Sequence, residues 1–209
     1  MCIRDRSSES AVIELAISRY FPEAYDLPCA SVCGGFIRST LEGTPPNDLD
    51  VFFDSPDSLY GAVAKICGVG RYICTETRYA FTFVNGSKKI QFIKNIYGQY
   101  NELPLQFDFT VCMASIPLIP GSNVFMSGLC RDDLTARRIR IYGITDALGT
   151  LRRVARYMEY GYSIEPCDIL TIHDALSLQR PKGDDYPEET LLPTTSTALC
   201  PDEYDPFAM

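Results

Sequence analysis

Two aspartates, Asp48 and Asp50, stand two residues apart at the start of the apolar run 51–53. If this run is a β-strand, both side chains point to the same side and lie about 6–7 Å apart along the chain. Two divalent cations about 3.5–4 Å apart need carboxylates placed in this way, one cation for the acceptor oxygen and one for the phosphate leaving group. The alternative for an isolated acid-x-acid pair is a solvated strand edge. Because so apolar a strand is not expected to begin with two acids without a chemical reason, we interpret the pair as a metal site.

A pair of glycines, Gly34 and Gly35, precedes the aspartates and is followed by a short helical pattern at 36–41. Glycine has no Cβ, so the backbone amides of such a turn can approach a phosphate closely. A helix that begins directly after the turn adds the positive end of its dipole for the same anion. The segment therefore predicts a phosphate-binding turn beside the proposed metal site.

The periodicity of the rest of the chain predicts the elements that position these groups. The expected helices span 8–20, 36–41, 55–67, 131–137, 146–160 and 168–179. The expected strands span 29–33, 48–53, 71–76, 79–84, 88–94, 106–113 and 138–142. Asn85-Gly86 is a strong signal for a hairpin turn. The order indicates an α+β fold, in which a mixed β-sheet flanked by helices is followed by a short helical neck.

Charge is distributed unevenly along the chain. The formal net charge is −8, and the tail 181–209 contains seven acidic residues but only one lysine. A cluster of arginines precedes the tail and comprises Arg131, Arg137, Arg138, Arg140, Arg152, Arg153 and Arg156. This cluster predicts a local basic face for a triphosphate or a nucleic-acid backbone. The alternatives are a solvated helix face, or pairing of the arginines with the acidic tail.

Composition limits the classes that remain. The chain has 209 residues, of which 46% are hydrophobic, enough for one packed domain with a small helical appendage. No stretch approaches the roughly 20 apolar residues of a membrane span, so we expect a soluble protein without a membrane partner. The nine cysteines are odd in number and form no C-x-x-C pair, which favours reduced thiols in a cytoplasm. Nothing in the sequence indicates an oligomeric state.

The segment 34–53, GGFIRSTLEGTPPNDLDVFF, resembles the active-site signature of the DNA polymerase β-type nucleotidyltransferase superfamily. It is most similar to the poly(A) polymerase and class II CCA-adding branch, whose pattern reads GGxVRD followed by DxD. The segment 107–115 resembles the RRDFTINAMA strand of that branch, and 151–164 resembles its neck helix. The resemblance covers about residues 30–165 in the same order.

The resemblance implies a five-stranded nucleotidyltransferase head. In it, Gly34 and Gly35 contact the triphosphate, and Asp48 and Asp50 bind Mg²⁺ or Mn²⁺. Asp108, expected on a neighbouring strand, either completes the metal site or addresses the sugar. For Asp108 the alternative is an acid paired with a nearby arginine.

Three basic residues complete the set of nucleotide-binding candidates: Arg38, Arg153 and Arg156. By analogy with the arginine of GGxVRD, Arg38 contacts phosphate or braces the Gly-Gly turn. The sequence also departs from the family. Ser39 stands where the family has an aspartate, and the EDxxR motif that reads the incoming base falls on Asp146, Ala147 and Thr150. Without the base-reading aspartate and arginine, we expect loose selection among the NTPs.

These observations predict four segments. Residues 1–7 are expected to be non-native or disordered, 8–143 to form the nucleotidyltransferase domain, 144–180 the helical neck, and 181–209 an acidic tail rich in Pro and Thr. The leading hypothesis is a magnesium-dependent enzyme that transfers a nucleoside monophosphate from an NTP to an acceptor hydroxyl, with an RNA 3′ end as the favoured acceptor. A protein side chain or a small molecule is the alternative acceptor. The other hypotheses are a catalytically degenerate nucleotide- or nucleic-acid-binding domain and a structural subunit of a larger assembly.

Overall fold

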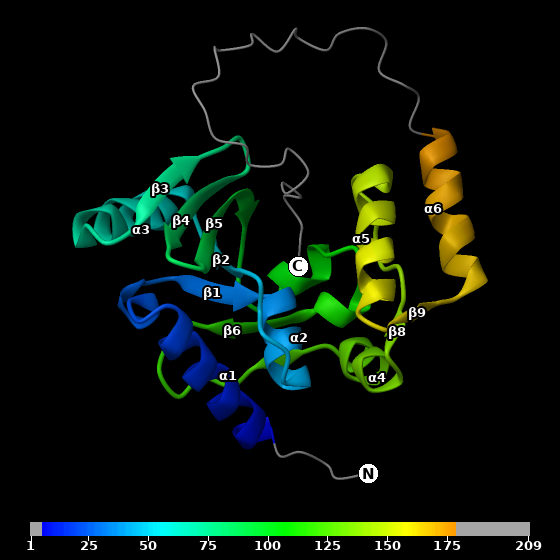
Figure 1. The fold of residues 1–209 in the computed structure, drawn as a ribbon, viewed down its shortest axis with the longest axis horizontal. Helices are drawn as coiled ribbons and strands as arrows, with labels where there is room; N and C mark the ends of the chain where they lie inside the picture. The colour runs from blue at the N-terminus through cyan, green and yellow to red at the C-terminus, as the bar shows by residue number, and fades with distance from the viewer. Residues whose placement is uncertain (1–5, 179–209) are drawn as a thin grey trace, which may run out of the picture.

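The structure is a computed structural model that describes residues 6–178. Its centre is a β-sheet with helices on both sides (Figure 1). The helices are α1 (Arg6–Tyr20), α2 (Gly35–Glu42), α3 (Pro56–Val69), α4 (Gly128–Ala136), α5 (Ala147–Glu159) and α6 (Pro166–Leu178). The strands are β1 (Ala30–Cys33), β2 (Leu49–Phe53), β3 (Ile73–Glu76), β4 (Ala80–Asn85), β5 (Lys88–Tyr97), β6 (Ala114–Pro117), β7 (Phe125–Met126), β8 (Arg138–Ile139) and β9 (Ser163–Ile164). Three short 3-10 turns are η1 (Ala24–Asp26), η2 (Leu103–Gln106) and η3 (Thr110–Cys112).

The main sheet contains seven strands in the order β3-β4-β5-β2-β1-β6-β7. It is a mixed sheet, because β2 and β5 run parallel whereas the other neighbours run antiparallel. The predicted mixed sheet is therefore confirmed, although the five strands implied by the resemblance are two fewer than the sheet contains. The parallel pair places Leu49 beside Ile90 and Asp50 beside Gln91. This register decides which side chains surround the two aspartates.

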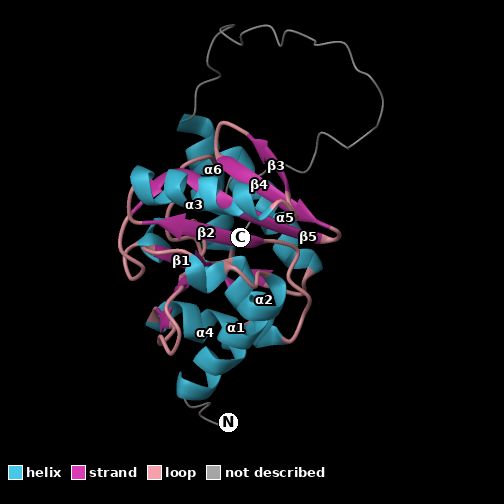
Figure 2. Cartoon of the chain, turned by 90° about the vertical axis from the view of Figure 1, so that its left-hand side faces the viewer, coloured by secondary structure: helices cyan, strands magenta, loops and turns pink. Residues whose placement is uncertain are grey.

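Two hydrophobic cores lie on opposite faces of the sheet. Alternate residues of β2, namely Leu49, Val51 and Phe53, join the first core with residues of α1, α2 and α3. Phe52 faces the other way and joins the second core with residues of α5 and α6. The period of two along a strand therefore places Asp48 and Asp50, like Phe52, on the face turned toward the neck. Figure 2 shows α1, α2 and α4 gathered at one end of the molecule and β3, β4 and β5 at the other.

Most of the predicted elements are confirmed within a few residues of their bounds. Ser55 caps α3 by accepting a hydrogen bond from the Ser58 amide at 3.3 Å, with Pro56 in the first turn, as the sequence indicates. The Asn85-Gly86 turn joins β4 to β5, and Gly86 has a φ of 61°, which favours glycine. Helix α1 begins at Arg6, so residues 6 and 7 belong to a helix rather than to a disordered end. Residues 1–5 and the acidic tail lie outside the described residues.

The predicted strand at 106–113 is wrong. Its alternating pattern reads as a strand, but the chain there forms η2 and η3, with a single bridge between Phe109 and Ile141. The reason is burial on more than one side: Phe107, Phe109 and Val111 pack in the second core beneath the neck, and the residues between them are buried as well, at most 5% exposed. A segment enclosed in this way does not need an open sheet face. The family-like motif therefore lies in the segment that connects β5 to β6, residues 98–113, and not in a strand of the sheet. We call this segment the crossover.

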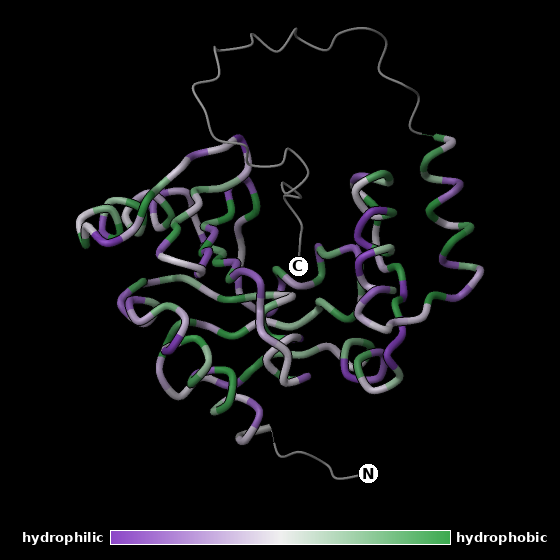
Figure 3. The backbone as a smooth tube through the Cα atoms, viewed as in Figure 1, coloured by the Kyte–Doolittle hydropathy of each residue, from purple (hydrophilic) through white to green (hydrophobic). Residues whose placement is uncertain are grey.

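The neck packs onto this crossover through α5 and α6, which lie side by side (Figure 1). The outer helix α6 carries polar and apolar residues along its surface (Figure 3), and the side chains of Ile169 and Leu170 are exposed. None of the helices in residues 6–178 has the length and apolar character needed to cross a membrane.

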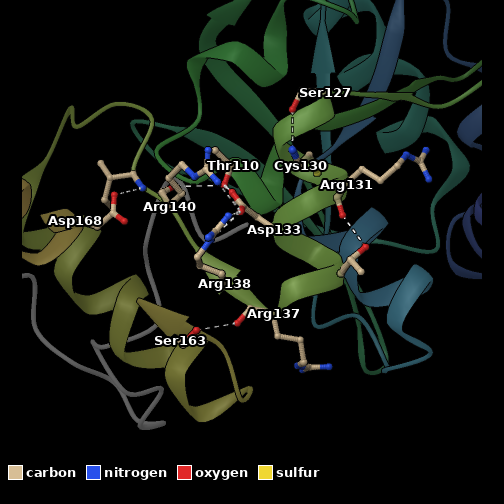
Figure 4. Close-up of polar contacts among 12 residues, drawn as sticks. Thr110, Ser127, Cys130, Arg131, Asp133, Arg137, Arg138, Arg140, Ser163 and Asp168 are labelled. Carbon is tan, nitrogen blue, oxygen red and sulfur yellow. Dashed lines mark hydrogen bonds and ion pairs between the residues drawn. The ribbon is translucent and has the colours of Figure 1, made fainter. Parts of the chain in front are cut away.

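One buried carboxylate, Asp133 of α4, joins the crossover to the connector that leads to the neck (Figure 4). Asp133 is fully buried, and it accepts hydrogen bonds from Thr110 Oγ1 at 2.6 Å, Arg138 Nη2 at 2.5 Å and Arg140 Nη2 at 3.1 Å. A buried carboxylate is stable only when its charge is paired and its oxygens accept hydrogen bonds. Asp133 therefore fixes the path of β8 relative to the sheet.

We predict that Asp133→Asn lowers the free energy of unfolding by about 3 kcal/mol, because two arginines lose the charge that pairs with them in a partly buried site. Urea denaturation measures the change. Asp132→Asn is the matched control, since Asp132 is the exposed neighbour on the same helix, and we expect it to shift stability by less than about 0.5 kcal/mol. Equal losses for the two variants would contradict the role given to Asp133.

Candidate active site

The Gly-Gly turn has the geometry that the sequence predicts. β1 ends at Cys33, and the next residue, Gly34, has a φ of 72° and donates its amide hydrogen to the Ala114 carbonyl at 2.9 Å. This backbone conformation strongly favours glycine. Helix α2 begins at Gly35, and no side chain caps its N-terminus. Its first amides are therefore available to an anion, and the helix dipole favours negative charge there.

Asp48 directly precedes β2 and Asp50 is the second residue of that strand, and the antiparallel pairing of β1 with β2 brings both near this turn. The Asp48 side chain is 18% exposed, and Asp50 is 5% exposed. Both carboxylates raise the pKa of the Tyr20 phenol, which is raised mainly by burial, so both lie within electrostatic reach of the same hydroxyl. Two carboxylates share one desolvated corner of the sheet.

Two basic side chains approach Asp48. Burial raises the pKa of Asp48 above its usual range, whereas the charges of Lys89 and Arg156 favour the ionised form and partly offset this effect. Lys89 Nζ lies 3.8 Å from Asp48 Oδ2. Arg156 comes from α5 and is half-buried, and its charge acts on Asp48 from the neck side. Its neighbour Arg152 is exposed.

Gln91 occupies the position beside Asp50 on the neighbouring strand. The two residues are register partners in the parallel pair of β2 and β5, and Gln91 is 5% exposed. Its amide donates to Thr82 Oγ1 at 3.4 Å, one strand further across the sheet. The third carboxylate was expected from Asp108 on a neighbouring strand, but the residue beside Asp50 on β5 is Gln91. The chain instead has a neutral amide there, whose oxygen can still ligate a hard cation.

Asp108 lies elsewhere. It belongs to the crossover rather than to a strand beside β2, and its Oδ2 accepts hydrogen bonds from Arg153 Nη2 and Thr150 Oγ1 of α5. Asp108 and Arg153 are 5% and 2% exposed, so the pair is buried. Of the alternatives for Asp108, the structure shows the acid paired with an arginine. Arg153, expected to bind nucleotide, and Thr150, at the motif position of the base-reading arginine, both serve this contact.

Arg38 braces α2 against the neck. Its guanidinium carbon lies 4.6 Å from the ring centre of Tyr157 and 5.2 Å from that of Tyr160. Its Nη2 donates to Ser39 Oγ at 3.1 Å, and its Nε lies 3.7 Å from Glu42 Oε2. Nε and Nη1 make no hydrogen bond within the described residues, and the aromatic faces are what stabilises this buried cation. Arg38 therefore connects α2 to α5.

Much of the predicted basic cluster is occupied by internal partners. Arg131 forms a bidentate pair with Glu9 of α1, with distances of 2.9 and 3.0 Å, and Arg138 and Arg140 pair with Asp133. Arg137 lies 3.5 Å from Glu42. These arginines hold elements together instead of forming a continuous basic face. Arg152 and Arg156 are the two members for which the described residues provide no carboxylate ion pair.

The donor set fits a divalent cation held by two carboxylates. Within residues 6–178, no group of three or more His, Cys, Asp or Glu side chains is placed to hold a metal ion. Mg²⁺ is commonly bound by one or two carboxylates, with substrate phosphates and water filling the octahedron. Asp48 and Asp50 match this pattern, and the raised pKa of Asp48 marks a desolvated carboxylate whose charge a cation would stabilise.

Sequence reasoning did not identify three residues of this corner: Lys89, Gln91 and Tyr20. Lys89 and Gln91 reach the aspartates only through the parallel pairing of β5 with β2, which joins segments about forty residues apart. Tyr20 ends α1, and its hydroxyl donates to the Asn47 carbonyl at 3.1 Å and accepts from the Lys89 amide at 3.1 Å. No local sequence pattern predicts these contacts of Tyr20, Lys89 and Gln91.

The fold is that of a nucleotidyltransferase-like head. Among solved structures, a CCA-adding enzyme in complex with CTP is similar with a TM-score of 0.63 at 18% identity, covering 85% of this chain and 47% of the other. The Thermotoga maritima CCA-adding enzyme complexed with tRNA gives 0.59 at 19% identity, covering 85% and 46%. A tRNA-processing enzyme in an apo form gives 0.60 at 15% identity, covering 78% and 47%. The predicted superfamily fold is thus confirmed.

The sequence also identifies a family. Residues 9–116 match the family described as "Gabija anti-defense 2 family protein", and the chain belongs to this family. A curated relative, "Gabija anti-defense 2" of Bacillus phage SPbetaL7, is 23% identical over 146 residues. The match covers 68% of this chain but only 36% of that relative, so the chain spans about a third of the relative's length.

The first prediction for the site concerns Asp108. We expect Asp108→Asn to lower the free energy of unfolding by about 3 kcal/mol, because the buried Arg153 loses its counter-charge. Calorimetric titration at a temperature where the variant is folded should show Mn²⁺ affinity within about twofold of wild type, as Asp108 holds α5 and not the ion. The exposed Asp174→Asn is the control. A large loss of Mn²⁺ affinity without a loss of stability would instead make Asp108 a metal ligand.

The second prediction concerns Gln91. We expect Gln91→Glu to raise Mn²⁺ affinity by about tenfold, since the number of charged ligands sets the affinity for hard cations. The same change should lower stability without metal, because a new carboxylate then faces Asp50. Gln106→Glu, which adds the same charge at an exposed position, should change neither quantity. Unchanged Mn²⁺ affinity in Gln91→Glu would show that the ion does not lie at this pair of strands.

Proposed function

We propose that this chain is a magnesium-dependent nucleotidyltransferase that moves a nucleoside monophosphate from an NTP to an acceptor hydroxyl, and that the transfer serves to counter the Gabija defence. One observation carries the proposal. Asp48 and Asp50 share a desolvated corner of β2, near a Gly-Gly turn that opens onto the uncapped N-terminus of α2. The family description supports a role against the Gabija defence, and the similarity of fold to CCA-adding enzymes supports nucleotide transfer as the reaction.

Each group of the site has a role in this chemistry. Asp48 and Asp50 would hold the divalent ions, and Mg²⁺ bound there supplies the charge that activates the acceptor oxygen and stabilises the departing pyrophosphate. The Gly35 amide at the uncapped start of α2 would face the phosphates, and Gly34 provides the turn before it, since the Gly34 amide already donates to the Ala114 carbonyl. Arg156 extends from α5 toward Asp48 and adds positive charge on the neck side of the site. Phe52, on the same face of β2 as Asp50, belongs to the second core.

The neck residues bear on which nucleotide is selected, and the similar structures bear on the acceptor. Thr150 donates to Asp108, and Ala147 is buried, so the positions of the base-reading pair offer no bidentate contact to a base. We therefore infer loose selection among the NTPs. An RNA 3′ end is the acceptor that we propose, because the similar structures include enzymes complexed with tRNA, with CTP and with an ATP analogue.

The proposal is tested by incubating the chain with each labelled NTP, Mg²⁺, and either total RNA or cell protein. We expect label in the RNA fraction. Asp48→Asn and Asp50→Asn should each lower the rate by about a thousandfold, the equivalent of several kcal/mol of lost charge stabilisation. Asp57→Asn, an exposed acid in the first turn of α3, is the control.

The fractions separate the acceptor classes. Label in the protein fraction would overturn the RNA acceptor while keeping the transferase, and strict use of CTP followed by ATP would overturn loose selection. Near-wild-type transfer by Asp48→Asn would overturn the assignment of the site.

A second function, nucleotide binding without transfer, is favoured by Gln91. A site with two carboxylates and a neutral amide has one negative charge fewer than a site with three carboxylates, and this weakens its hold on a second metal ion. Under this alternative the chain would bind an NTP with Mg²⁺ but label no acceptor. The assay above distinguishes the two functions when it is combined with a binding titration of the same NTP.

A further inference from the structure

Lys89 is the cation next to the proposed metal ligands. It lies on β5 one residue before Ile90, the register partner of Leu49, and is thus adjacent to Asp48 across the parallel pair. Its Nζ is 3.8 Å from Asp48 Oδ2, and its side chain is 35% exposed. The lysine therefore lies beside the carboxylate with its side chain partly exposed to solvent.

The backbone of Lys89 is held firmly. Its amide donates to the Tyr20 hydroxyl at 3.1 Å, and the same hydroxyl donates to the carbonyl of Asn47 at 3.1 Å, directly before Asp48. The Tyr20 ring packs edge-on against Phe36 of α2, with centroids 5.4 Å apart. One hydroxyl thus joins the strand of the lysine to the strand of the aspartates. These contacts hold the backbone of Lys89, whereas the end of its side chain makes no hydrogen bond at Asp48.

The contact between Lys89 and Asp48 is weak enough to open. A separation of 3.8 Å exceeds hydrogen-bond distance, and partly exposed ion pairs of this kind contribute little stability. A divalent cation at Asp48 would repel the ammonium and take over the carboxylate. The released ammonium then lies beside the phosphates that bind that cation, and ammonium groups bind phosphate as compact point charges.

We propose that Lys89 is a phosphate-binding residue of this site, paired with Asp48 until a metal ion and an NTP arrive and then transferred to the triphosphate. The inference rests on the proposed function for the identity of the ligand. It also gives Lys89 two opposite effects: it competes with the metal ion when no nucleotide is present, and it assists the nucleotide when metal is present. A lysine with a merely structural role would not have effects of opposite sign.

Lys89→Met tests this, because methionine retains an unbranched side chain of similar length without the charge. With Mn²⁺ alone as the probe, calorimetric titration should show affinity raised by about threefold, as a weak competing ion pair is lost. With ATP and Ca²⁺, a hard cation that oxygen ligands bind, ATP affinity should fall by about tenfold or more, as a charge-assisted contact to phosphate is lost.

Lys88→Met is the matched control. Lys88 is the adjacent residue of β5, alternation along the strand turns it to the other face, and its Nζ donates to the Arg19 carbonyl at 2.5 Å. We expect both affinities to stay at wild-type values in this variant. An effect of the same sign on Mn²⁺ and ATP in Lys89→Met, or no effect on either, would overturn the inference.

The outcome is separable from that of the proposed function. Opposite shifts in the two titrations together with no transfer to any acceptor would support the role of Lys89 and overturn catalysis. Normal transfer in wild type together with unchanged titrations in Lys89→Met would support the transferase and overturn the role of Lys89.

Discussion

The buried ion pair between Asp108 and Arg153 is the contact on which the arrangement of the site depends. Removing either partner would leave an uncompensated charge in the second core, so the pair tolerates little change in the distance between the crossover and α5. The pair adds little net stability compared with apolar residues of the same size, but it fixes the position of α5. By fixing α5, it also fixes the two residues further along that helix, Arg156 and Tyr157, which face Asp48 and Arg38. The neck is therefore part of the site.

The charges around the aspartates are close to balance before any ligand binds. Asp48 and Asp50 provide two negative charges, Lys89 and Arg156 provide two positive charges nearby, and Gln91 adds none. This balance explains how two desolvated carboxylates can share one corner of the sheet without a cation. A metal–triphosphate complex carries charge of both signs. Its metal ion can therefore pair with the two aspartates while its phosphates pair with Lys89 and Arg156.

Local patterns in the sequence were sufficient for most elements, because caps, turns and hydrophobic periodicity are local. The Ser55 cap, the Asn85-Gly86 turn and the apolar faces of α1 and β2 are of this kind. The resemblance identified the superfamily through the Gly-Gly turn and the two aspartates.

The failures that bear on the site are non-local. The parallel register of β5 and β2, which brings Lys89 and Gln91 to the aspartates, joins distant segments. The segment 106–113 has a strand-like pattern, but it is enclosed by the neck and therefore coils. The clustering of arginines along the chain also did not predict a continuous basic surface. Arg131, Arg138 and Arg140 each form an ion pair with a carboxylate from another element.

The account is tested most directly by a crystal structure of the chain with Mn²⁺ and a non-hydrolysable NTP, in which anomalous scattering locates the metal. We predict an anomalous peak within coordination distance of carboxylate oxygens of both Asp48 and Asp50, about 2.0–2.2 Å away as for a small hard cation, with the phosphates lying along Gly34 and Gly35. A nucleotide bound elsewhere, or a metal peak remote from these two carboxylates, would contradict the central claim.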